Sequence, residues 1–228
     1  MRSQTEEFAK LHDVCAELAK QYPESKRLFS SEQFALRWSG RSKEADALAQ
    51  ERLKLLPEDL DAMRALPNNA TSREDYVGAY ESERALVASA KAEASDLNSL
   101  AWDSLFTGNT KQEDAESAVK AAQQGQNSPA ILHTLGCVYA ELGKTKEARE
   151  VLIQAMDALT LDEPDLNYWY AFGRIAEQYG EFETAKNDYL RVSKPNKPNQ
   201  IPGSSYRLAQ NRLKVLGPSA SGVPSAKQ

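Results

Sequence analysis

Three side chains that could bind a metal or act as nucleophile and base stand on successive helical turns: His133, Cys137 and Glu141. At this spacing they share one face of a helix, where an imidazole, a thiol and a carboxylate could hold a metal ion. Zinc prefers four ligands, and the other such pair, His12 and Cys15, belongs to a distant helix. As nucleophile and base, Cys137 and His133 lack an orienting third group. We therefore expect neither a metal nor catalysis, and a metal-binding helical protein is the less favoured alternative.

The run Gly143-Lys144-Thr145 imitates the end of a phosphate-binding loop. Such a loop needs a glycine five residues earlier, where Val138 stands, and a preceding strand. Here a helical pattern precedes the run, and its lysine and threonine open the next helix. The sequence predicts no phosphate site and no cofactor.

Composition narrows the class of partner. The chain has 228 residues, 41% of them hydrophobic and 27% charged, with a formal net charge of −5. An acidic balance argues against nucleic acid and against an anionic membrane surface. The N-terminus lacks the apolar stretch of a signal peptide, and the two cysteines lie far apart, so we expect a cytoplasmic protein. The short start and the Ser/Pro/Gly-rich end would also suit a fragment of a longer protein.

Helical signals recur along the whole chain, while strand signals are nearly absent. Ser3 and Glu6 resemble a capping box, and Pro67-Asn68-Asn69 predicts the end of a short helix. The expected helices span about 3–22, 23–38, 42–56, 60–66, 72–92, 95–107, 111–124, 129–142, 145–159, 165–179, 182–192 and 204–216. Residues 195–202 read as a semi-extended connector, and residues 218–228 as a disordered tail.

A repeat connects the later helices. Two sets of positions recur 33 and then 37 residues apart: Ala115, Ala148 and Ala185 on the second helix of each pair, and Trp102, Leu135 and Phe172 on the first. Gly136 and Gly173 each follow the large residue of the first helix. Small residues at these places allow two helices to cross at about 8–10 Å. The sequence therefore predicts helix pairs that stack on copies of themselves.

This pattern resembles the tetratricopeptide repeat, whose units have about 34 residues. The resemblance is clearest over 96–195 and implies an all-α fold, a right-handed α-solenoid of antiparallel helix pairs. It divides the chain into N-terminal helices with degenerate repeats (1–93), three repeats (94–195), a connector with a capping helix (196–217) and the tail (218–228).

The resemblance also implies a concave groove lined by the first helix of each unit. The positions that line it in the family fall here on Leu97, Leu100, Ser104, His133, Cys137, Glu141, Asn167, Tyr170, Arg174 and Glu177. Members that grip the terminal carboxylate of a chaperone tail use Lys and Asn where this chain has Leu100 and Ser104. We therefore expect another occupant, an extended peptide or a partner helix.

The function that follows is that of a protein-protein interaction scaffold without catalytic activity, which binds another protein or peptide as a monomer. The alternative is an accessory or regulatory helical domain of a larger multidomain enzyme. The sequence does not identify the partner.

Overall fold

The computed structural model describes residues 4–89, 91–165 and 167–217. These residues form twelve α-helices and one short 3-10 helix, with no strand among them, so the all-α expectation is confirmed. The helices are α1 (Gln4–Gln21), α2 (Lys26–Trp38), α3 (Ser42–Leu55), α4 (Leu60–Ser72), α5 (Tyr76–Val87), α6 (Ala94–Ser104), α7 (Gln112–Gln124), α8 (Pro129–Glu141), α9 (Thr145–Ala158), α10 (Trp169–Gln178), α11 (Phe182–Arg191), η1 (Pro198–Gln200) and α12 (Ser205–Leu216). Ser3 and the tail 218–228 lie outside the described residues, so the expected capping box and disordered tail are not addressed.

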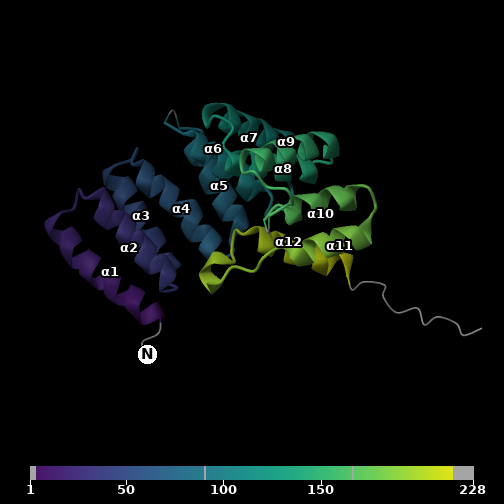
Figure 1. The fold of residues 1–228 in the computed structure, drawn as a ribbon. Helices are drawn as coiled ribbons and strands as arrows, with labels where there is room; N and C mark the ends of the chain where they lie inside the picture. Colours follow the sequence, from purple (N-terminus) through teal and green to yellow (C-terminus); the bar gives the residue numbers. More distant parts are fainter. Residues whose placement is uncertain (1–3, 90, 166, 218–228) are drawn as a thin grey trace, which may run out of the picture.

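From α2 to α11 the helices pack as successive pairs that form a curved stack, the α-solenoid expected from the sequence (Figure 1). One buried alanine marks the second helix of each pair, and each is at most 1% exposed: Ala45, Ala79, Ala115, Ala148 and Ala185. They recur at intervals of 34, 36, 33 and 37 residues. The helices before residue 94 therefore follow the same pitch as the later ones.

Small residues allow the two helices of a pair to approach closely. A Cβ atom on Gly136 of α8 would lie 2.6 Å from Cγ of Leu152 on α9. A Cβ atom on Gly173 of α10 would lie 2.6 Å from Cε1 of Tyr189 on α11. Leu152 and Tyr189 are both fully buried, so each glycine leaves room for one large side chain of the facing helix.

Helix α4 corrects one expectation, because it does not end before Pro67 but continues through it to Ser72. A proline inside a helix costs about 3 kcal/mol, since it lacks the N–H group and its ring meets the preceding turn. Tertiary contacts oppose this cost: the fully buried Asn69 donates a hydrogen bond of 3.0 Å to Gln33 and accepts one of 3.2 Å from Arg37. These bonds fasten the last turn of α4 to α2.

The next helix consequently begins later than expected. Asp75, not Ser72, caps α5, and its side chain accepts a hydrogen bond of 3.0 Å from the amide of Gly78. Ser72 instead lies within hydrogen-bond distance of Ser42, 2.6 Å away on α3. The start of α5 is thus fixed by the acidic cap that follows the extended α4.

The C-terminal segment does more than cover the end of the stack. Helix α12 packs against α10 and α11 and buries Leu208 and Ala209. The connector between α11 and α12, residues 192–204, first runs back beneath α4 (Figure 1). There Lys197 lies 4.9 Å from the ring centre of Trp38 on α2, and the carbonyl oxygen of Gly203 accepts a hydrogen bond of 2.8 Å from Trp102 on α6. The connector therefore contacts the early and middle pairs.

Candidate functional site

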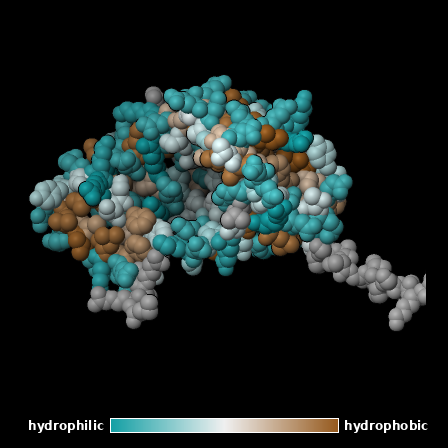
Figure 2. All heavy atoms as spheres, viewed as in Figure 1, coloured by the Kyte–Doolittle hydropathy of each residue, from teal (hydrophilic) through white to brown (hydrophobic). Residues whose placement is uncertain are grey.

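The first helices of the pairs form the inner wall of the arc, which is visibly hollowed in the space-filling view (Figure 2). Along this wall α2 packs on α4, α6 on α8, and α8 on α10. Two cavities open into it: cavity A of about 470 Å³, which separates α4 from α6, and cavity B of about 740 Å³, at α6, α8 and the residues just before α10. Trp102 lines both cavities. These cavities are the candidate binding surface.

The structure does not place the predicted groove residues of α6 on this wall. Leu97, Leu100 and Ser104 are only 7%, 5% and 0% exposed, so they belong to the core and their assignment is corrected. The cavities are lined instead by side chains on the other face of α6, among them Asn98 and Trp102.

The cause of this error is the length of the turn after α6. Gly143 precedes Ala148 by five residues, whereas Gly108 precedes Ala115 by seven. Alignment on the alanines therefore shifts α6 by two positions. Alignment on the glycines puts the fully buried Ala101 at the place of Gly136. The glycines that follow α6, α8 and α10 (Gly108, Gly143 and Gly180) are the feature of the sequence that gives the correct register.

On α8, His133 lies at the inner wall within a cluster of rings. Its ring centre is 5.8 Å from that of Trp102 and 4.7 Å from that of Tyr168. Its Nε2 lies 3.3 Å from the carbonyl oxygen of Asn167 and 3.6 Å from Sγ of Cys137. Burial lowers the pKa of His133, so its imidazole is neutral at pH 7. His133 and Asn167 both line cavity B.

Cys137 is fully buried, and burial raises the pKa of its thiol well above the usual value. A thiol of this kind is neither a nucleophile nor a ready metal ligand, because both roles require the thiolate. Among the described residues, no three His, Cys, Asp or Glu side chains are grouped so that they could hold a metal ion. The geometry thus gives the metal-binding alternative no support.

The predicted groove residues of α10 are engaged in an internal ionic cluster. Arg174 bridges Glu141 at 2.7 Å and Glu177 at 2.8 Å, and Glu177 also pairs with Arg212 of α12. Burial opposes ionisation of Glu177, but hydrogen bonds from Arg212 and Tyr189 outweigh it and lower the pKa of this carboxyl. Arg174 is 6% exposed and Glu177 has a side chain 9% exposed. Helix α12 therefore covers this end of the inner wall.

Tyr170 belongs to the same closed region. It is 1% exposed, and its hydroxyl donates a hydrogen bond of 3.4 Å to Glu141. Burial, aided by the charge of Glu141, raises the pKa of Tyr170. Of the residues expected to line the groove, His133 and Asn167 face cavity B, whereas the aromatic and charged side chains of α10 support the fold.

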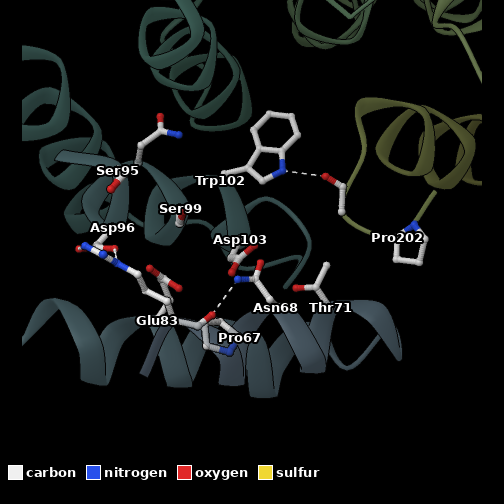
Figure 3. Close-up of a pocket in the computed structure, with 13 residues that line it drawn as sticks. Pro67, Asn68, Thr71, Glu83, Ser95, Asp96, Ser99, Trp102, Asp103 and Pro202 are labelled. Atoms are coloured by element: carbon white, nitrogen blue, oxygen red, sulfur yellow. Dashed lines mark hydrogen bonds and ion pairs between the residues drawn. The ribbon is translucent and has the colours of Figure 1, made fainter. Parts of the chain in front are cut away.

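Cavity A has an acidic lining that sequence patterns did not single out. Arg64 of α4 forms ion pairs of 2.7 Å with both Asp96 and Glu93, at the start of α6. Glu83 of α5, 3% exposed, and Asp103 and Trp102 of α6 also line the cavity (Figure 3). These residues come from three helices, so only the fold brings them together.

Comparisons with known proteins agree with this architecture. The tetratricopeptide repeat family matches residues 129–158, which form the pair α8–α9. Among solved structures, YrrB, described as a TPR protein with an unusual peptide-binding site, is 15% identical, with a TM-score of 0.58 over 89% of this chain and 99% of that one. A tetratricopeptide repeat protein from Parabacteroides merdae is 14% identical, with a TM-score of 0.59 over 90% and 78% of the two chains.

A third structure, a thermophilic TPR protein of Thermus thermophilus, is 19% identical, with a TM-score of 0.54 over 83% of this chain and 100% of that one. No curated protein matches the chain. The tetratricopeptide repeat matched at 129–158 and the solenoid fold shared with these structures confirm the resemblance seen in the sequence. Among the described helices, none has the length and apolarity needed to cross a bilayer.

Proposed function

We propose that this protein is a non-catalytic scaffold that binds a segment of another protein at cavities A and B on the inner wall of its solenoid. The observation that carries the proposal is the pair of adjoining cavities that share Trp102. Concave surfaces of stacked helix pairs are the usual binding surfaces of such folds. The groove that we propose is shorter than the sequence indicated, because α12 covers the part formed by α10.

The shape of the two cavities favours an extended segment over a bulky helix. The connector, with Pro202 and Gly203 at the rim of cavity A and Ser204 at cavity B, narrows the wall on one side. The rim has backbone and side-chain polar groups that can hydrogen-bond to an extended peptide. Successive side chains of such a peptide would enter the two cavities, where they meet aromatic rings. We also propose that the protein acts as a monomer in the cytoplasm, in keeping with its two buried, unpaired cysteines.

An affinity capture experiment tests the proposal. Ala130 is exposed at cavity B, so Ala130→Arg should fill the cavity without disturbing the core. The matched control is Gln154→Arg, which adds the same side chain at an exposed place on α9. We expect a protein captured from native lysate by the unaltered chain and by Gln154→Arg to be lost with Ala130→Arg. Equal capture by all three, with unchanged circular dichroism, would show that the inner wall is not the binding surface.

A further inference from the structure

Cavity A presents hydrogen-bond acceptors that the protein itself does not satisfy. Glu83 is 3% exposed and lines the cavity, yet its carboxylate has no hydrogen bond or ion pair with any described residue. Oδ1 of Asn98, also in the lining, is buried without a partner in the described part of the chain. Buried polar groups are normally hydrogen-bonded, and leaving one unpaired costs about 1–3 kcal/mol. Oδ1 of Asn98 therefore lacks a donor, and so does Glu83 when it is ionised; a ligand with N–H groups would supply both.

The charge of the lining points the same way. Arg64, the one cation among the described lining residues, is already held by Asp96 and Glu93, with Nε and Nη2 at 2.7 and 2.8 Å from the two oxygens of Asp96. Glu83 and Asp103 form no ion pair among the described residues, although the charge of Arg64 acts on Glu83. Two carboxyl groups in one cavity repel each other when both are ionised, and a cation placed between them would relieve this.

We propose that cavity A binds a cationic side chain of the partner segment, above all an arginine guanidinium. The proposal rests on the scaffold function proposed above and names the chemistry that the inner wall recognises. A planar guanidinium offers five N–H donors, enough for the carboxylates of Glu83 and Asp103 and for Oδ1 of Asn98. The indole of Trp102, at the rim of the same cavity, adds an aromatic surface of the kind that guanidinium groups stack upon.

The protonation of the lining supplies an independent signature. Burial, with the charges of Asp103 and Asp96, raises the pKa of Glu83 to about 8, although Arg64 opposes this. Burial alone raises the pKa of Asp103 to about 7. A bound cation favours both ionised forms, so binding releases protons near neutral pH and strengthens as the pH rises from 6 to 9.

A pair of small probes tests the proposal without knowledge of the partner. N-acetyl-arginine amide carries the cation, and N-acetyl-citrulline amide has nearly the same shape without the charge. Binding is followed at pH 8.5 through the NMR signal of the Trp102 indole N–H, identified by its loss in Trp102→Phe. We expect a saturable shift with the arginine probe, with a dissociation constant of about 1 mM. The citrulline probe should bind at least about tenfold more weakly.

Variants of the lining complete the test. Glu83→Gln and Asp103→Asn should each weaken the arginine probe at least about tenfold, while Glu116→Gln, an exposed carboxylate of α7, should leave it unchanged. Each of the first two changes removes a buried ionisable group at nearly constant shape, so the fold is kept, and circular dichroism verifies this.

Equal binding of the two probes, no saturable shift at all, or full affinity in Glu83→Gln would overturn the proposal. The capture experiment with Ala130→Arg is independent of these results. If Ala130→Arg does not reduce capture but the arginine probe binds more tightly than the citrulline probe, the scaffold function is rejected and the cation site is retained. If Ala130→Arg abolishes capture but the two probes bind equally, the scaffold function is retained and cavity A is rejected as the site that binds the cation.

Discussion

The indole N–H of Trp102 donates a hydrogen bond of 2.8 Å to the carbonyl oxygen of Gly203, a residue 101 positions further along the chain. This bond joins α6 to the connector that precedes α12. It also fixes the ring of Trp102 between the two cavities of the inner wall. The binding surface and the C-terminal segment are therefore coupled through one side chain.

The first prediction concerns this bond. Trp102→Phe removes the donor but keeps an aromatic ring, and should lower the free energy of unfolding by roughly 1–2 kcal/mol. Amide hydrogen exchange of residues 198–204 should become faster, because the connector loses an anchor, while exchange in α8 and α9 stays unchanged. Exchange measured by mass spectrometry reports both. Unchanged protection of the connector would show that its other contacts suffice to hold it.

The second prediction uses two glycines with the same backbone conformation. Gly203 has φ +73° and Gly40 has φ +79°, so alanine strains the backbone at either place by about 1 kcal/mol. A Cβ atom at Gly203 would also lie 2.8 Å from Cγ2 of Thr71, whereas none of the described atoms lies within 4 Å of one at Gly40. Gly203→Ala should therefore lower the melting temperature more than Gly40→Ala. Equal losses would argue that the connector does not press on α4.

The third prediction concerns pH. The pKa of Glu83 is raised to about 8 in the folded protein, whereas an unfolded glutamate titrates near its ordinary value of 4.5. Between these values the folded state holds a proton that the unfolded state has released, so stability falls as the pH rises from about 4.5 to 8. Glu83→Gln should remove this loss, which amounts to roughly 2–4 kcal/mol. Urea unfolding at pH 5 and pH 8.5 measures it.

A comparison of Glu83→Gln with the unaltered chain at two pH values tests the direction of this effect. The stability of Glu83→Gln relative to the unaltered chain should increase between pH 5 and pH 8.5. Glu116→Gln, the exposed control on α7, should show no such trend. A constant difference at both pH values would mean that Glu83 is ionised in the folded state throughout.

The fourth prediction tests the close approach of α8 and α9. Gly136→Ala places Cβ 2.6 Å from Cγ of Leu152 and should cost about 1–3 kcal/mol through overpacking, partly offset by the better helix propensity of alanine. Leu152→Ala alone should cost about 2–5 kcal/mol through the cavity it leaves. Because the two sites share one space, the double variant should be more stable than the sum of the single losses predicts. Strict additivity in chemical denaturation would contradict the contact.

The fold could be predicted wherever small residues recur at a fixed interval. Gly136 with Ala148 and Gly173 with Ala185 indicate helix pairs, and the structure has those pairs. Pro67 predicts a helix end that the structure does not have, because the effect of a proline is local whereas the contacts of Asn69 with α2 that sustain α4 are not. The predicted end of α4 and the predicted start of α5 were wrong for the same reason.

The candidate site was less accessible to sequence reasoning. His133, on the undistorted repeat of α8, and Asn167, just before α10, both line cavity B, and their role in binding stays a prediction. The residues of α6 were misplaced by the longer turn around Gly108. The acidic lining of cavity A comes from three helices, and the connector contacts Trp102 from 101 positions further along the chain. Neither relationship can be seen in a pattern of residues that are close in sequence.

Contacts of the connector with both Trp38 and Trp102 change the mechanics of the stack. In an open array of helix pairs, each pair touches only its neighbours, and the ends can fray while the middle stays intact. Here the connector contacts α2 and α6, so unfolding of the terminal pair also removes contacts from the early and middle pairs. Thermal melting should accordingly be a single cooperative transition with equal calorimetric and van't Hoff enthalpies. The stack should also resist extension more than an open array of helix pairs does.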